Sequence, residues 1–342
     1  ISVVLEAISY KDEDFTESNL YSQGNRYIGV CKSWADILSD CFKQESDDCC
    51  YHVQYGDKAN QADWTFTITP LDVAKLFYEK VIKNSDSIIL TSATLAENGN
   101  YDRIKSRLGF DRLGDRVQEV DPLAQIFNYR ENCVLAVPKD SPGYKQEGEF
   151  FRFMAATVYE IAMMLGGKTL VLFSSLKRRD AVYELVRPDL EKEGIRVLCG
   201  SSQGLVEKFR EGNSVLFGSK GFSEGIDVKG VALSCVIIDK LSFPYPGDPV
   251  LEARLRRTEN GFREILLPQA VLTLRQQFGR LLRSENDKGF VVVMDQLRPE
   301  TGYFANVRGN LPNVPYVYRP LDELRSLMKD RFYHWGLMEC NR

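Results

Sequence analysis

The sequence predicts an α/β fold in which helices cover both faces of a parallel sheet. Short runs of apolar, often β-branched residues alternate along the chain with longer segments that have helical spacing. Runs that are apolar throughout are typical of strands buried on both faces, as they are in parallel sheets. Alternation of this kind indicates strands that are connected by helices returning over the sheet.

Individual elements are expected from residue 65 onward. Strands are expected at residues 65–69, 87–91, 170–173, 196–199, 214–217, 232–238 and 289–294, where apolar and β-branched residues gather. Helices are expected at residues 71–77, 151–165 and 179–186, and from Pro268 to near Arg283. Pro188 is expected to stop the third of these helices, because proline has no N–H for the helical hydrogen bond. The first fifty residues are polar and predict less regular structure.

The tripeptide Gly167-Lys168-Thr169 matches the end of a nucleotide-binding P-loop but not its context. A P-loop has the pattern G-x-x-x-x-G-K-[ST] and runs from a strand into a helix. Here Ala162 stands at the place of the first glycine. The segment before the glycine has helical spacing and the segment after it resembles a strand, so the order is reversed. We therefore expect a helix that ends at glycine and leads into a strand.

Composition and charge limit the class of protein. With 342 residues, of which 44% are hydrophobic and 27% charged, the chain has room for two globular domains. The net charge of −4 excludes nucleic-acid binding through overall charge and requires a local patch instead. Because no apolar run approaches the roughly 20 residues of a membrane helix, no membrane partner is expected. The start has neither an initiator Met nor a signal-peptide pattern, which predicts a piece of a longer protein.

The eight cysteines are scattered along the chain, as is typical of a reducing compartment. A cytoplasmic location is therefore expected, with association to the nucleoid, or a nuclear location in a eukaryote. Four cysteines lie near His52 in the sequence, at a spacing that fits no zinc or iron–sulfur pattern. These four are Cys31, Cys41, Cys49 and Cys50. Ordinary thiols and no metal site are expected.

A small polar segment, Thr-Ser-Ala-Thr-Leu at residues 91–95, directly follows an expected strand. Open α/β sheets bind ligands at the carboxyl ends of their strands, which makes the hydroxyls of Ser92 and Thr94 candidates for a site. The same residue types are also common in ordinary turns after strands.

A glycine-rich loop at residues 218–230 follows another expected strand. Glycine lets a backbone approach a ligand closely, and the loop carries Lys220, Glu224 and Asp227. The lysine is a candidate phosphate contact, whereas the carboxylates are better suited to ribose hydroxyls or to arginines. The alternative is a flexible surface loop.

The helix that begins at Pro268 has one apolar side and one polar stripe. On a helical wheel Arg280 and Arg283 lie within about 40° of Gln276, and nothing acidic in the helix offsets them. Gly279 borders the stripe and leaves room for a partner. The apolar residues on the opposite side are Leu267, Val271, Leu274, Phe278, Leu281 and Leu282, with Leu272 as the exception. The stripe is either a solvated charged face or a site for phosphate oxygens, which suit arginine forks.

Taken in order, these segments resemble the motifs of superfamily 2 helicases, and in particular of DinG/XPD-like 5′→3′ DNA helicases. The three motifs are TSATL at 91–95, GFSEGID at 221–227 and QQFGRLLRS at 276–284. Supporting segments are TITPLDVAKLF at 67–77, RIKSRLGF at 103–110, LVLFSS at 170–175, SFPYPGDP at 242–249 and DKGFVVVMDQLRP at 287–299. The resemblance covers residues 65 to 299.

The resemblance implies two RecA-like motor domains, with ATP and Mg²⁺ in the cleft between them and single-stranded or forked DNA across the top. It implies that residues 1–64 belong to an insertion, residues 65–135 to the end of the first motor domain, and residues 136–342 to the second. The implied residues facing the nucleotide are Gln276, Arg280 and Arg283, one arginine being the finger. Those implied in nucleotide binding and coupling are Glu224, Gly225, Asp227, Gly279, Ser92 and Thr94. Those implied in DNA binding are Ser174, Ser175 and Lys220.

The chain departs from the family pattern in having no P-loop and no D-E-A-H-like pair. We therefore expect it to be the C-terminal half of a helicase, to need the N-terminal motor domain of its parent, and to hydrolyse no ATP alone. An iron–sulfur cluster, where the parent has one, is expected upstream of this chain. Two alternatives stay open: an RNA-directed superfamily 2 helicase, and a degenerate RecA-like nucleic-acid-binding module without catalysis.

Overall fold

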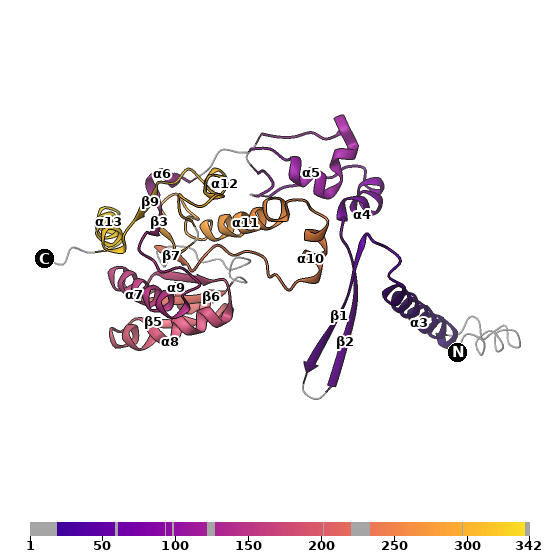
Figure 1. Cartoon of the computed structure of the whole chain (residues 1–342), viewed down its shortest axis with the longest axis horizontal. Coiled ribbons are helices and arrows are strands. Elements are labelled where there is room, and N and C mark those ends of the chain that lie inside the picture. The colour runs from indigo at the N-terminus through magenta and orange to yellow at the C-terminus, as the bar shows by residue number, and fades with distance from the viewer. Residues whose placement is uncertain are drawn as a thin grey trace, which may run out of the picture. The chain divides into compact units, whose positions relative to one another are not determined.

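The computed structural model divides the chain into two compact units (Figure 1). Unit 1 comprises residues 1–90, 102–118 and 246–259, and unit 2 comprises residues 91–101, 119–245 and 260–342. The chain therefore passes from one unit to the other after residues 90, 101, 118, 245 and 259. The residues that the structure describes are 19–58, 61–92, 94–97, 99–121, 127–200, 202–219, 233–295 and 297–338.

Unit 2 is built on a parallel sheet, as the sequence predicts. Its described strands lie in the order β5-β6-β4-β7-β8-β3-β9, and every neighbouring pair is parallel. The strands are β3 (Cys133–Pro138), β4 (Thr169–Phe173), β5 (Arg196–Cys199), β6 (Ser214–Ser219), β7 (Cys235–Ile238), β8 (Gly289–Val293) and β9 (Tyr316–Arg319). Because all strands run the same way, their carboxyl ends share one edge of the sheet, which is the edge where such sheets bind ligands.

Helices cover both faces of this sheet, and the buried side chains form one cluster on each face. Alternate residues of β3 show the division, because Leu135 and Val137 join one cluster whereas Val134 and Ala136 join the other. The first cluster includes α9 (Gln203–Arg210) and α11 (Leu267–Phe278), and the second includes α7 (Glu147–Leu165), α8 (Leu176–Lys192) and α13 (Leu321–His334). The helices of unit 2 are α6 (Tyr129–Asn132), α7 (Glu147–Leu165), α8 (Leu176–Lys192), α9 (Gln203–Arg210), α11 (Leu267–Phe278), α12 (Phe304–Gly309) and α13 (Leu321–His334), with a π-helix, η4 (Phe262–Leu266), before α11. The predicted fold class is confirmed.

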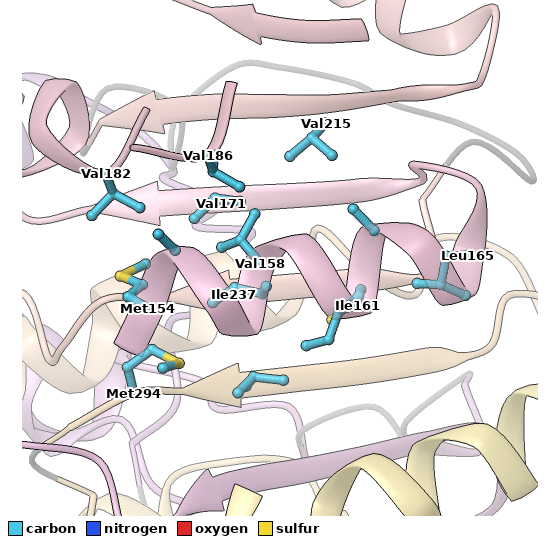
Figure 2. Close-up of a cluster of buried hydrophobic side chains, with 14 of the residues drawn as sticks. Met154, Val158, Ile161, Leu165, Val171, Val182, Val186, Val215, Ile237 and Met294 are labelled. Carbon is cyan, nitrogen blue, oxygen red and sulfur yellow. The ribbon is translucent and has the colours of Figure 1, made fainter. Parts of the chain in front are cut away.

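The second of these clusters shows how α7 is fixed to the sheet (Figure 2). Met154, Val158, Ile161 and Leu165 follow one another at the spacing of a single helix face, and all are at most 2% exposed. They lie against the side chains of the neighbouring strands, including Val171 (Figure 2). Burying each aliphatic side chain contributes about 1.5 to 3 kcal/mol, so this face holds the helix in place.

The Gly-Lys-Thr segment joins a helix to a strand, as the sequence predicts. α7 ends at Gly166, whose φ of 60° and ψ of 47° are left-handed, and β4 begins at Thr169. Gly167 follows with a φ of 89°, and a Cβ atom there would lie 2.4 Å from the backbone nitrogen of Ser214. The two glycines therefore turn the chain in a space that admits no side chain at the second position.

Two expected elements are wrong in detail. α8 continues through Pro188 to Lys192. Val186 and Leu190, on either side of the proline, are both buried, so packing outweighs the missing N–H donor. Residues 87–91 form no strand, and Ile89 is 88% exposed. A buried strand needs neighbours to pair with its backbone, and no described segment supplies them here.

Unit 1 contains an antiparallel two-stranded ribbon and short helices. The ribbon pairs β1 (Cys49–Lys58) with β2 (Gln61–Pro70), which includes the strand expected at residues 65–69. The helices are α3 (Asn19–Lys43), α4 (Val73–Lys80), α5 (Asp102–Leu108) and α10 (Pro249–Arg256), with 3₁₀ turns η1 (Ile82–Asn84) and η2 (Phe110–Arg116). Asp72 caps α4 through a 2.8 Å bond from the N–H of Ala74.

The N-terminal region is more regular than the sequence predicts, because α3 is a continuous helix of 25 residues. The boundaries expected after residues 64 and 135 fall inside β2 and β3. The assignment of the three segments to an insertion and two motor domains stays a prediction.

Candidate functional site

The apolar side of α11 faces the core, as the helical wheel predicts. It inserts into the same cluster as β7 and β8 and thereby fixes the end of the helix against the sheet. Leu272, the expected exception, is half-buried. The predicted core residues are each at most 5% exposed: Leu267, Val271, Leu274, Phe278, Leu281 and Leu282.

The helix itself is shorter than the sequence predicts, because it ends at Phe278 and not near Arg283. The N–H groups of Arg280 and Leu281 donate to carbonyls three residues back, at 3.1 Å each, which forms a tight turn. The Asp287 carboxylate then accepts the N–H groups of Arg283 and Ser284 at 2.8 Å. An acidic side chain downstream thus replaces the helical acceptors, and helical spacing does not describe the last part of the stripe.

The three polar residues of the expected stripe are all half-buried: Gln276 at the end of α11, and Arg280 and Arg283 in the turn after it. Burial lowers the pKa of Arg280. Burial, followed by the nearby Arg210 cation, lowers the pKa of Arg283, and the Asp287 carboxylate opposes this shift. Two guanidiniums are thus partly desolvated at the end of one helix, an environment that an anion would stabilise.

Gly279 lies between these residues and is exposed. Its φ of −64° is ordinary for any residue, and a Cβ atom there would come no closer than 3.5 Å to a neighbouring atom. The described part of the chain therefore places no demand for glycine at this position.

Ser92 and Thr94 lie together after the first unit crossing. Their hydroxyl oxygens are 3.2 Å apart, and the Thr94 N–H donates to Ser92 Oγ at 3.3 Å. Two residues further on, the Ala96 carbonyl accepts a 3.0 Å hydrogen bond from Nη1 of Arg275. The structure therefore connects the segment at 91–95 with α11 through an arginine that the sequence analysis did not single out. Nothing in its position on the helical wheel marks Arg275 as different from other polar residues.

Ser174 and Ser175 lie at the carboxyl end of β4, in two different roles. The Ser174 hydroxyl donates to Asp239 Oδ2 at 2.8 Å, and its N–H donates to Oδ1 at 3.0 Å. Ser175 is exposed and caps α8, where its oxygen accepts the N–H of Arg178 at 3.4 Å. The hydroxyl of Ser174 is thus committed inside the protein, whereas Ser175 stands at the start of a helix, open to solvent.

Asp239 is the centre of a buried group that sequence reasoning missed. It follows β7, is 0% exposed, and also accepts Arg178 Nε at 2.9 Å and the Lys240 N–H at 2.8 Å. Burial raises the pKa of Asp239, while the Arg178 guanidinium and the Ser174 hydroxyl lower it. A lone aspartate directly after an apolar run was the available sequence signal. The group ties the ends of β4 and β7 together.

A second set of contacts extends along the same edge from Lys240. Its ammonium lies 4.4 Å from the ring centroid of Tyr144. The Tyr144 N–H donates to Oδ2 of Asp295, which follows β8, at 2.7 Å. Arg298 pairs with Oδ1 of Asp295 at 3.1 Å and donates to the Ser141 carbonyl at 2.9 Å. The carboxyl ends of β3, β4, β7 and β8 are thus held by one series of polar contacts.

Four of the predicted site residues lie outside the described residues. They are Lys220, Glu224, Gly225 and Asp227 of the glycine-rich loop. Among the described cysteines, Cys31, Cys41, Cys49, Cys50, Cys133, Cys199 and Cys235 are all free thiols. In the same part of the chain no three His, Cys, Asp or Glu side chains are grouped so as to hold a metal ion. Across the described ranges, no helix is both long and apolar enough to cross a membrane.

Comparison with known proteins agrees with this architecture. Residues 158–313 match the helicase C-terminal domain family. The chain is 33% identical over 266 residues to the ATP-dependent DNA helicase YoaA of Escherichia coli, across 76% of the chain and 41% of that protein. It is 29% identical over 296 residues to the 3′-5′ exonuclease DinG of Bacillus subtilis, across 83% of the chain and 32% of that protein.

A solved structure of an XPD helicase has the same fold, with a TM-score of 0.52 at 18% identity over 75% of this chain and 48% of that one. The sheet of unit 2 is therefore RecA-like. The chain spans less than half the length of each protein compared here. On these similarities the chain resembles the C-terminal half of DinG/XPD-like helicases, with residues 158–313 matching a helicase C-terminal domain.

Proposed function

We propose that the chain is the C-terminal motor portion of an ATP-dependent DNA helicase of the repair and replication type that moves in the 5′→3′ direction. The observation that carries the proposal is the pair of half-buried guanidiniums, Arg280 and Arg283, beside Gln276 at the end of a helix fixed in the core. Partly desolvated cations suit the phosphates of ATP, because an anion offsets the free energy lost on their burial.

In this proposal one of the two arginines is the finger that stabilises charge on the transferred phosphoryl group. Gln276 lies next to the nucleotide, which is ATP with Mg²⁺ held by the N-terminal motor domain of the parent. Gly279 is proposed to leave room for that motor domain, because the described structure itself does not require a glycine at this position. An iron–sulfur cluster, where the full-length parent has one, is proposed to lie upstream of this chain.

The remaining candidates divide into coupling and DNA binding. Ser92, Thr94, Glu224, Gly225 and Asp227 are proposed to link nucleotide state to DNA grip. The 3.0 Å bond from Arg275 to Ala96 supports such a link, since it joins the segment of Ser92 and Thr94 to α11.

Ser175 and Lys220 are proposed to contact the backbone of single-stranded or forked DNA. Ser174, which precedes Ser175 in the chain, is held by its hydrogen bond to Asp239. The proposed location is the cytoplasm, in association with the nucleoid, or the nucleus in a eukaryote.

The chain alone is expected to hydrolyse no ATP, because it carries neither a P-loop nor a D-E-A-H-like pair. The test is the ATPase rate of the purified 342-residue chain with and without single-stranded DNA. DNA-stimulated turnover by this chain would contradict the assignment of the nucleotide cradle to the missing half.

The arginine assignment is tested in the full-length parent with Arg280→Ala and Arg283→Ala. Loss of the finger is expected to lower the ATPase rate by about 10³-fold or more and to abolish unwinding. Arg187→Ala is the control and should leave both activities unchanged, because the contacts of Arg187 with Glu184 and with the ring of Tyr183 lie within α8. Normal unwinding by both site variants would contradict the proposal that one of these arginines is the finger.

The same assay separates the alternatives. Matched DNA and RNA duplexes distinguish a DNA helicase from an RNA-directed one, and a parent that binds strands without turnover would be a degenerate binding module. An end-labelled strand in the same reaction reports any exonuclease activity, the reaction for which the Bacillus subtilis relative is named.

A further inference from the structure

Three aromatic rings of unit 2 form a cluster that the proposed ATP and DNA contacts do not use. The ring centroids of Phe243 and Phe262 are 5.7 Å apart, those of Phe262 and Tyr303 5.8 Å, and those of Phe243 and Tyr303 6.3 Å. Phe243 and Tyr303 are half-buried and pack on the core cluster that contains α11. Phe262 is 40% exposed, so it is the outer ring of the three.

The aromatic residues of the cluster belong to segments that leave the carboxyl edge of the sheet. Phe243 follows β7 and Tyr303 follows β8, and these strands are neighbours in the sheet. The next strand, β4, ends at Ser174 and Ser175. Three adjacent strands therefore lead to the aromatic rings and to Ser175, which is proposed to contact DNA.

Phe262 is held in an unusual backbone. It begins the π-helix η4, in which the Leu267 N–H donates to the Phe262 carbonyl five residues back. Such turns are rare and occur often at functional sites. The two rings behind Phe262 fix its orientation, which reduces the entropy lost when a flat ligand stacks on it.

The cluster continues into the contacts around Lys240. Burial, followed by Asp295 and Tyr144, raises the pKa of Tyr303. The ring of Tyr144 lies under the Lys240 ammonium at 4.4 Å. Asp295 is nearly buried and paired with Arg298, so the carboxylate is offset. Aromatic rings and a cation therefore follow one another along this edge.

We propose that Phe262, supported by Phe243 and Tyr303, is a stacking platform for a base of single-stranded DNA. The inference rests on the proposed function and adds a base contact to the backbone contacts proposed there. Stacking on an aromatic ring is independent of sequence, because every base has a flat face, and this suits a motor that moves along any strand. A protein partner would instead be expected to cover a broader apolar patch than one exposed ring.

The experiment compares two fluorescent strands of equal length, oligothymidylate and a fully abasic strand, bound to the 342-residue chain at one low salt concentration. Phe262→Leu keeps an apolar side chain on the two supporting rings but removes the flat face. It is expected to weaken binding of oligothymidylate about tenfold and to leave binding of the abasic strand unchanged. Phe262→Trp keeps the flat face and is expected to bind both strands as the unmodified chain does.

Tyr333→Leu is the matched control, because Tyr333 is 58% exposed on α13, a helix on the other face of the sheet. It should bind both strands normally. A Phe262→Leu chain that keeps the normal preference for bases, or loses affinity equally for both strands, would overturn the platform while leaving DNA binding intact. An unmodified chain that binds neither strand would overturn the proposed DNA contacts of this half, and the platform with them.

A second measurement needs no variant. A strand that contains 5-iodouracil, cross-linked by light to the unmodified chain and mapped by mass spectrometry, is expected to attach at Phe262, Phe243 or Tyr303. Attachment only at positions away from these rings would contradict the platform even if Phe262→Leu proved unstable.

Discussion

At the scale of single residues, Gly167 is a position where the neighbouring backbone leaves no room for a side chain. We expect Gly167→Ala to lower the free energy of unfolding by about 2 to 4 kcal/mol, because the φ of 89° is strained for alanine and the new Cβ would lie 2.4 Å from the Ser214 nitrogen. Gly166→Ala is the control. Its φ of 60° is also left-handed, but nothing lies within 4 Å of the added atom, so about 1 kcal/mol is expected. Urea unfolding of both variants measures the difference, and equal losses would show that the close approach has no effect.

Asp239 is the residue on which the buried contacts of the sheet edge depend. Asp239→Asn is expected to lower the free energy of unfolding by about 3 to 5 kcal/mol, because the buried Arg178 then has no carboxylate at 2.9 Å. Asp189→Asn, at an exposed pair with Lys192, should change it by less than about 0.5 kcal/mol. Urea unfolding of both variants measures these changes. A loss of unfolding free energy no larger than that of the control would mean that the Arg178 guanidinium is stabilised without the Asp239 carboxylate.

The thiols give a residue-scale prediction of pH dependence. Burial raises the pKa of Cys133 and of Cys235 above that of a thiol in the unfolded chain. A raised folded-state pKa stabilises the protein below the unfolded pKa, and this contribution declines as the pH rises above about 8.5. We therefore expect the urea midpoint to fall between pH 8 and pH 10 by more than in a Cys133→Ala, Cys235→Ala double variant.

Reaction of the native protein with a thiol reagent checks the same burial independently. Cys31, which is exposed, should react, while Cys133 and Cys235 should react only after unfolding. Modification of all three at one rate in the native protein would contradict the burial of the strand cysteines.

At the scale of elements, α8 contains a proline that its packing tolerates. Pro188→Ala restores an N–H donor to the helix interior, and we expect it to raise the free energy of unfolding by about 1 to 3 kcal/mol. Arg187→Ala, one residue away on the same helix, should have an effect near zero. Urea unfolding measures both, and destabilisation by Pro188→Ala would indicate that the helix is bent to fit the proline.

Sequence patterns identified elements well where local periodicity and burial agree. The strands β4, β5, β6 and β8 and the helix α7 were predictable because each is apolar throughout or along one face. The strand expected at residues 87–91 failed because an apolar run specifies burial and not the neighbours that must pair with it. β3 and β9 were not predicted, since prolines near the first and polar residues near the second hide the pattern.

The candidate site was predictable in its polar residues and less so in its geometry. The wheel placed the core side of α11 correctly, but the Asp287 cap that ends the helix early comes from beyond the periodic segment. Asp239, Lys240 and Arg275 escaped notice because their roles arise from partners far away in the sequence, which periodicity does not register.

At the scale of the whole molecule, the two units differ in how much apolar side chain they bury. The described buried apolar residues of unit 1 are few: Cys41, Cys50, Ala74, Ile82, Phe110 and Leu251. Unit 2 has two large clusters, one on each face of its sheet. We expect hydrogen exchange by mass spectrometry to show β1 and β2 exchanging faster than β4, β7 and β8, because a two-stranded ribbon is marginally stable by itself. Equal protection of both sets would mean that the units unfold as one.

The repeated passage of the chain between the units, after residues 90, 101, 118, 245 and 259, limits how the protein can be divided. A protease that cuts any one of these connections divides at least one unit between two fragments, which then stay together only through non-covalent packing. Neither unit can be produced whole by choosing a single start or stop codon, so shortened versions must be made by joining segments with new linkers.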